Sequence, residues 1–128
     1  MRKDKRDTDM NSHARVRAQL LQLYGYIDML TGQEIPNFRS ASFHHITKDE
    51  FGGDYTVDNG AMLLWQTHSF IHNIIEANDP ELFDLLMECL YYYKYCIDNN
   101  CETLVEQFQK EVQPEVKKLV LSNQKKKR

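Results

Sequence analysis

The sequence has few of the features that mark secreted or membrane proteins. It holds three cysteines, an odd number, and no CxxC pair, which favours reduced thiols over a disulfide framework or a zinc knuckle. No apolar run approaches the roughly 20 residues that span a bilayer. The first residues, MRKDKRDTDMNSH, lack the apolar segment of a secretory signal. These absences predict a cytoplasmic protein without membrane association, and 128 residues suffice for one small domain.

Basic residues are scarce in the middle of the chain and concentrated at its ends. Of the 16 lysines and arginines, six fall in residues 1–17 and six in residues 117–128. Between these ends stand four basic residues against sixteen acidic ones. Basic ends on an acidic body suit non-specific contact with phosphates. The alternative is that both ends are merely solvated and flexible, and the sequence leaves this open.

The apolar pattern predicts one helix before residue 25. Val16, Leu20 and Tyr24 recur at helical spacing, and Ser12 is a candidate N-cap for the helix that carries them. Residues 1–12 are therefore expected to form a basic flexible tail. The stretch after this helix is rich in glycine, proline and asparagine, which predicts turns in place of long regular elements.

A strand, a loop, a second strand and a helix are expected next. Residues 41–47 (ASFHHIT) are rich in aromatic and β-branched side chains and predict a strand. Residues 48–59 contain glycines and aspartates and predict a loop, and residues 61–65 (AMLLW) predict the second strand. Thr67 is a candidate N-cap for a helix over residues 68–77. Together these elements form a ββα unit.

The last third of the chain predicts a pair of helices. Asp79-Pro80 has the pattern of an N-cap followed by proline at the first helical position, and an apolar stripe runs from there to Ile97. An Asp-Asn-Asn run breaks the pattern, and Pro114 interrupts or kinks the helix that follows. We expect residues 79–122 to form an antiparallel helical hairpin and residues 123–128 a basic tail. The expected class is α+β, mostly helical.

Four of the five histidines lie between residues 44 and 72. His68 and His72 are four residues apart on the expected helix, so both rings face one side and can bind one metal ion. His44 and His45 are neighbours on a strand and should point to opposite faces. One of them can be a third ligand while the other acts as an acid or base. Either histidine pair alone is more often an ordinary feature of a protein surface, but the two pairs together in one ββα unit favour a metal site.

The order of these residues closely resembles the HNH motif of ββα-metal (His-Me finger) nucleases, particularly the His-rich version in DNase colicins and phage enzymes. That motif contains a His pair, a loop with two glycines, an asparagine and a final HxxxH. The residues of this chain that match it are His44-His45, Gly52-Gly53, Asn59, His68 and His72. The match covers roughly residues 24–76, within an expected nuclease core of residues 13–78 that includes the leading helix.

The resemblance implies a role for each of these side chains. His44, His68 and His72 would bind one divalent metal ion, which could be Mg, Mn, Ni or Zn. His45 would be the general base that activates water. Asn59 would hold the loop between the strands and so help to orient His45. The reverse assignment of His44 and His45 stays open, because strand geometry alone does not say which ring faces the metal.

The activity implied is that of an endonuclease or nickase that hydrolyses DNA phosphodiester bonds. RNA remains an alternative substrate, because the motif contacts the backbone. A second hypothesis is a non-catalytic module that retains the metal site and binds nucleic acid or protein. The candidates for phosphate contact are Arg15, Arg17, Arg39 and Lys48. The C-terminal helices are a candidate surface for a protein partner or for self-association.

The chain departs from the family at the positions of a second metal. Many HNH proteins carry two CxxC pairs that bind a structural zinc ion. Here Asp28 and Thr31 stand in the first region and Trp65 in the second. A structural zinc is therefore not expected, and packing must brace the ββα unit instead. A proline common shortly after the first histidine is also missing, with Lys48 nearby.

Overall fold

The computed structural model of the chain has an α+β fold and describes residues 5–47 and 54–126. Within those ranges it contains five α-helices, one short 3-10 helix and one antiparallel sheet. The elements are α1 (Lys5–Tyr24), η1 (Phe38–Ser40), β1 (Ala41–His45), β2 (Gly60–Leu64), α2 (Trp65–Glu76), α3 (Pro80–Asp98), α4 (Glu102–Glu111) and α5 (Gln113–Lys126). In the described part of the chain, no helix combines the length and the apolar character needed to cross a bilayer.

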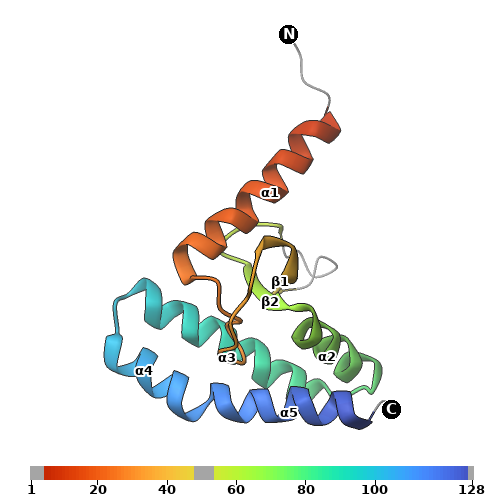
Figure 1. Cartoon of the computed structure of the whole chain (residues 1–128), viewed down its shortest axis with the longest axis vertical. Helices are drawn as coiled ribbons and strands as arrows, with labels where there is room; N and C mark the ends of the chain where they lie inside the picture. Colours follow the sequence, from red (N-terminus) through yellow and green to blue (C-terminus); the bar gives the residue numbers. More distant parts are fainter. Residues whose placement is uncertain (1–4, 48–53, 127–128) are drawn as a thin grey trace.

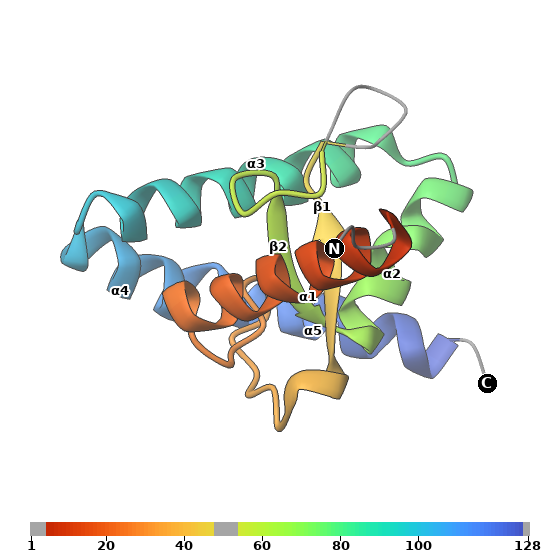
Figure 2. The ribbon, with the colours of Figure 1, turned by 90° about the horizontal axis from the view of Figure 1, so that it is seen from above.

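The two strands lie between helical layers. β1 pairs with β2 in an antiparallel register that places His44 opposite Ala61 and His45 opposite Gly60. Figure 1 shows α1 on one side of this ribbon and the α3–α5 layer on the other. In Figure 2, α2 and the end of α5 lie at one end of the molecule, and α4 lies at the other. The sheet thus has two covered faces.

Alternate side chains of the strands enter two different cores. Ala41 and Met62 pack with Leu20 on the α1 side, whereas Leu63 packs with Ile71 of α2 on the other side. This division follows from the two-residue period of a strand. The predicted order of two strands and a helix is confirmed, with boundaries at most three residues from those expected.

Two predicted helix caps are wrong. The first helix begins at Lys5, so Ser12 lies inside it and is not its N-cap, because no glycine or proline interrupts the sequence between Lys5 and Tyr24. Residues 5–12 are accordingly helical, where a flexible tail was expected. Thr67 lies inside α2, fully buried, and the N-cap residue is Leu64, which makes no side-chain cap bond.

The start of α2 is fixed instead by a buried carboxylate. Asp28 is completely buried, and its Oδ1 accepts hydrogen bonds from the backbone N–H groups of Leu30 and Thr31, each at 2.9 Å. Its Oδ2 accepts the N–H of Leu64 at 2.9 Å. One side chain therefore joins the turn after α1 to the end of β2, where the resembling family places a structural zinc ion. The sequence predicts that packing braces this region; in the structure, hydrogen bonds to the Asp28 carboxylate also brace it.

The C-terminal helices follow the predicted pattern closely. Asp79 caps α3, with its carboxylate accepting the N–H of Leu82 at 3.2 Å, and Pro80 takes the first turn. Asn100 adopts a positive φ of 56° in the break after α3, which an asparagine tolerates better than most residues. Pro114 lies in the first turn of α5, so the interruption falls at Val112. α3 contacts α4, and α5 returns along α2 (Figure 1).

Candidate metal centre

The three predicted metal ligands, His44, His68 and His72, lie near one another on the α2 side of the sheet. The ring centroid of His44 on β1 lies 5.3 Å from that of His68 on α2. The His68 and His72 centroids are 4.8 Å apart. Zn–N bonds of about 2.0–2.1 Å in tetrahedral geometry place two ligating rings roughly 5 Å apart, centre to centre. The His44–His68 and His68–His72 separations are therefore each in the range of two rings on one ion.

The ring nitrogens, however, face other partners. Nε2 of His44 lies 3.1 Å from Sδ of Met87, a weak acceptor, and Nδ1 of His68 is hydrogen-bonded to the Ser42 hydroxyl. Among the described residues, no three His, Cys, Asp or Glu side chains already converge on one point. A metal ion bound by these rings would use their other nitrogens, Nδ1 of His44 and Nε2 of His68, or displace the Met87 and Ser42 contacts.

Burial keeps two of these rings in the form that binds metals. Desolvation, with smaller contributions from the charges of His68, His72 and His45, lowers the pKa of His44 to about 3. Desolvation, followed by the charges of His72 and His45, lowers the pKa of His68 to about 4. Both imidazoles are therefore neutral near pH 7, as a metal ligand must be.

His45, the expected general base, lies on the other face of β1. Its ring makes edge contacts with Phe43, at 4.9 Å between centroids, and with Tyr55, at 5.6 Å. Tyr55 is also stacked between Phe43 and His13 of α1, with both centroids at 3.9 Å. The prediction that neighbouring strand histidines point to opposite faces is confirmed. His45 is the last residue of β1, so its ring stands at the edge of the aromatic layer.

Asn59 holds both ends of the loop between the strands. Its Oδ1 accepts the backbone N–H of Thr47 at 2.8 Å, and its Nδ2 donates to the carbonyl of Thr47 at 3.0 Å and to that of Asp54 at 2.9 Å. Its own carbonyl accepts the N–H of Ile46. This is the loop-holding geometry that the resemblance implied, and it fixes the end of the strand that carries His45.

A buried lysine, for which the sequence predicts no role, also holds the loop that precedes β2. Lys94 on α3 is only 5% exposed. Its ammonium group donates to the carbonyls of Val57 at 2.6 Å, Asp58 at 3.0 Å and Gly60 at 2.6 Å. Burial lowers the pKa of Lys94, against the opposing effect of nearby carboxylates. Lys94 thus anchors the chain where it enters β2.

The candidate phosphate contacts differ in their surroundings. Arg15 and Arg39 are exposed and can reach a ligand in solution. Arg17 differs from the expectation, because its Nη2 donates to the carbonyl of Ala41 at 3.0 Å and its guanidinium lies 4.6 Å above the Phe38 ring. Lys48 and the Gly52-Gly53 pair lie outside the described residues. Among the described residues, Arg15 and Arg39 are therefore the exposed candidates.

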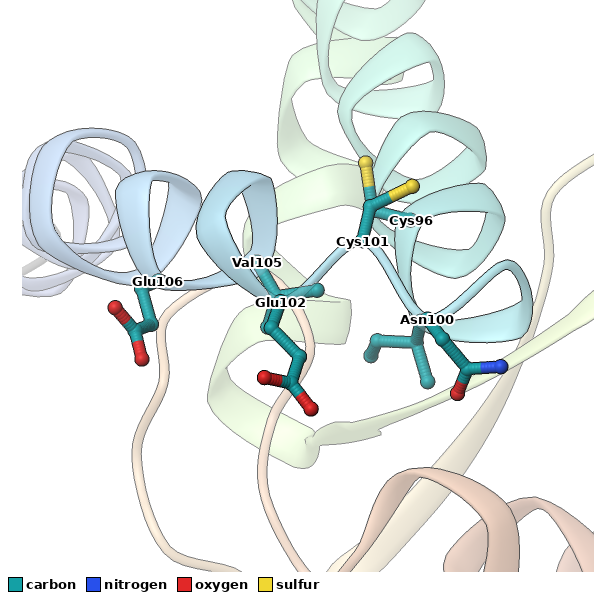
Figure 3. Close-up of a pocket in the computed structure, with 7 residues that line it drawn as sticks. Cys96, Asn100, Cys101, Glu102, Val105 and Glu106 are labelled. Carbon is teal, nitrogen blue, oxygen red and sulfur yellow. The ribbon is translucent and has the colours of Figure 1, made fainter.

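A hollow of about 280 Å³ lies at the junction of α3 and α4, away from the histidines. Figure 3 shows the sulfur atoms of Cys96 and Cys101 on one side and the carboxylates of Glu102 and Glu106 extending to the other. These groups do not gather on one point, and the carboxylates repel phosphates. The hollow is therefore unsuited to either a metal ion or a nucleic acid.

The chain was compared with models of known families, with curated proteins and with solved structures, and none of them matches it. Its function must therefore be argued from its own residues and their geometry.

Proposed function

We propose that the chain is a metal-dependent endonuclease or nickase of the HNH type that hydrolyses phosphodiester bonds in DNA. The observation that carries this proposal is the grouping of His44, His68 and His72, from β1 and α2, at ring separations that suit one ion. The loop asparagine, Asn59, adds a second matching part, because it holds the strand end beside these rings.

Each side chain then has a distinct task. His44, His68 and His72 would hold one divalent cation, with Mg, Mn, Ni and Zn as the candidates; imidazole ligands favour Ni or Zn over Mg. Such an ion, when bound, stabilises negative charge on the scissile phosphate and on the leaving oxygen. His45 accepts the proton of the attacking water, for which an imidazole is suited near neutral pH.

The opposite faces of His44 and His45 restrict where the substrate can lie. A phosphate bound over either covered face of the sheet would reach only one of the two rings. A phosphate at the end of β1 can approach both, because His45 is the last residue of that strand. The bonds from Asn59 to Thr47 and Asp54 hold this end in place. We therefore place the reacting phosphate at the end of β1, between the two ring systems.

The test is cleavage of supercoiled plasmid by the purified chain with Mg²⁺, Mn²⁺, Ni²⁺ or Zn²⁺, and with EDTA. We expect metal-dependent nicking or linearisation that is lost in His45→Ala. His13→Ala is the matched control, because His13 is the one histidine outside the motif. A labelled RNA of the same sequence, run in parallel, decides between the two nucleic acids. Cleavage that survives His45→Ala would remove this residue as the base.

A non-catalytic binding module is the second candidate. It is favoured by the absence, among the described residues, of three His, Cys, Asp or Glu side chains that converge on one point. This candidate predicts DNA or protein binding without cleavage under any of the four metals. Retained binding together with intact plasmid would therefore replace the nuclease proposal with this one.

A further inference from the structure

An exposed tryptophan stands beside the histidine cluster. Trp65, the only tryptophan of the chain, opens α2 and is 58% exposed. Its indole N–H donates to the carbonyl of Arg39 at 3.1 Å. Its ring also stacks on His68, with centroids 6.2 Å apart and planes 26° from parallel. The ring is thus held in one orientation while most of its surface faces solvent.

A groove of about 620 Å³ runs along this ring. It is lined by Asn37, Arg39, Ser40, Leu64, Trp65 and Gln66. The groove combines a large aromatic surface, an exposed cation and the amides of asparagine and glutamine. This combination suits a nucleotide, because a base stacks on an aromatic ring and an arginine pairs with phosphate. An acidic ligand also complements Arg39, whereas the hollow between α3 and α4 repels one.

We propose that this groove binds an unpaired nucleotide on the Trp65 side of the histidine cluster, at the opposite end of the β1–β2 ribbon from His45, with its base stacked on Trp65 and its phosphate on Arg39. The assignment rests on the proposed function, because His68 links the Trp65 ring to the candidate metal centre. A single-stranded end, a gap or a flipped nucleotide presents such a base, whereas the bases of a closed duplex are already stacked. The substrate class is thus DNA with an unpaired base within a few nucleotides of the cut site.

The fluorescence of Trp65 gives a direct test without any metal. In EDTA, the full chain is titrated with single-stranded oligothymidylate and with a blunt duplex of equal length. We expect saturable quenching by the single strand and weaker quenching by the duplex. Equal quenching by the duplex would overturn the choice of an unpaired base. Emission that depends on protein concentration without oligonucleotide would show that a second copy occupies the groove, and would overturn the site.

Variants are compared by the anisotropy of a labelled single strand. Stacking of one base accounts for roughly a 5- to 150-fold change in affinity, so Trp65→Ala should raise Kd about tenfold and Trp65→Phe should raise it less. Arg39→Gln should weaken binding and reduce the salt dependence by about one phosphate contact. Tyr95→Ala is the matched control, because Tyr95 is a 63% exposed aromatic residue on α3. An equal loss in Tyr95→Ala, or none in Trp65→Ala, would refute the stacking site.

These binding measurements are independent of cleavage. Plasmid cleavage with unchanged binding in Trp65→Ala would retain the nuclease and remove the nucleotide groove. Stacking on Trp65 without cleavage under any metal would retain the groove and assign the chain to the binding-module alternative. Thermal unfolding of Trp65→Phe shows whether loss of the bond to the Arg39 carbonyl has altered the fold, so a failed variant is distinguished from a failed site.

Discussion

Replacement of the buried carboxylate of Asp28 should destabilise the whole ββα unit. In Asp28→Ala, the N–H groups of Leu30, Thr31 and Leu64 lose the carboxylate that accepts their hydrogen bonds. A hydrogen bond to a charged group contributes about 1.5–3 kcal/mol, which sets an upper limit of about 9 kcal/mol for three. Because they share one carboxylate and water can enter the space left by the deletion, we expect a loss of about 4 kcal/mol in the free energy of unfolding.

The variant Asp28→Asn distinguishes the contributions of the two carboxylate oxygens of Asp28. Asp28→Asn can keep Oδ1 on the 28–31 turn, but its NH₂ group then faces the N–H of Leu64, so we expect a loss of about 2 kcal/mol. Urea unfolding followed by circular dichroism measures both changes, with an unaltered slope as the check on two-state behaviour. Asp84→Ala, at an exposed carboxylate on α3, is the control and should stay within about 0.5 kcal/mol. A loss below about 1 kcal/mol in Asp28→Ala would refute the bracing role.

Three further predictions follow from the same contacts. Lys94→Met should lower the free energy of unfolding by about 3 kcal/mol in urea, because three carbonyls lose their donor; Lys118→Met, at an exposed site, should not, and equal effects would refute the anchoring. A divalent metal at 100 times its Kd should stabilise the chain by about 2.7 kcal/mol in thermal unfolding, and His68→Ala should abolish this gain; a gain that persists would place the metal elsewhere. Asn59→Asp keeps the acceptor for the Thr47 N–H and removes the two donated hydrogen bonds, so plasmid cleavage should fall at least about tenfold. The helical signal in circular dichroism should be unchanged. Unchanged cleavage would show that activity does not need the hydrogen bonds donated by Asn59.

Local patterns in the sequence predicted the elements well, and long-range contacts escaped prediction. The strands, the Asp79 cap and the break near Asn100 depend on neighbouring residues, whose preferences are visible in the sequence. The bond from Asp28 to Leu64 joins residues 36 apart, and the contact of His44 with Met87 joins residues 43 apart. Contacts between residues so far apart in the sequence cannot be predicted from local periodicity, because only the fold brings the groups together.

The candidate site shows the same division. The clustering of histidines predicted which rings would meet, and the structure places three of them on one face of the sheet. The sequence did not reveal Ser42 and Met87 as the partners of these rings, because neither residue stands in a spacing that marks a histidine partner. Trp65 was considered only as a residue in the place of a cysteine, since exposure depends on how α2 meets the rest of the chain.

The distribution of charge indicates the direction from which a nucleic acid would approach. Figures 1 and 2 both place the C-terminal end of α5 beside α2, at the end of the molecule opposite α4. α5 ends there at Lys126, while Glu102 and Glu106 line the hollow by α4. A polyanion is attracted to the first end and repelled from the second. The α2 end also carries Trp65 and the histidine cluster. Charge, stacking surface and candidate ligands therefore favour the same approach, although each is set by a different segment of the chain.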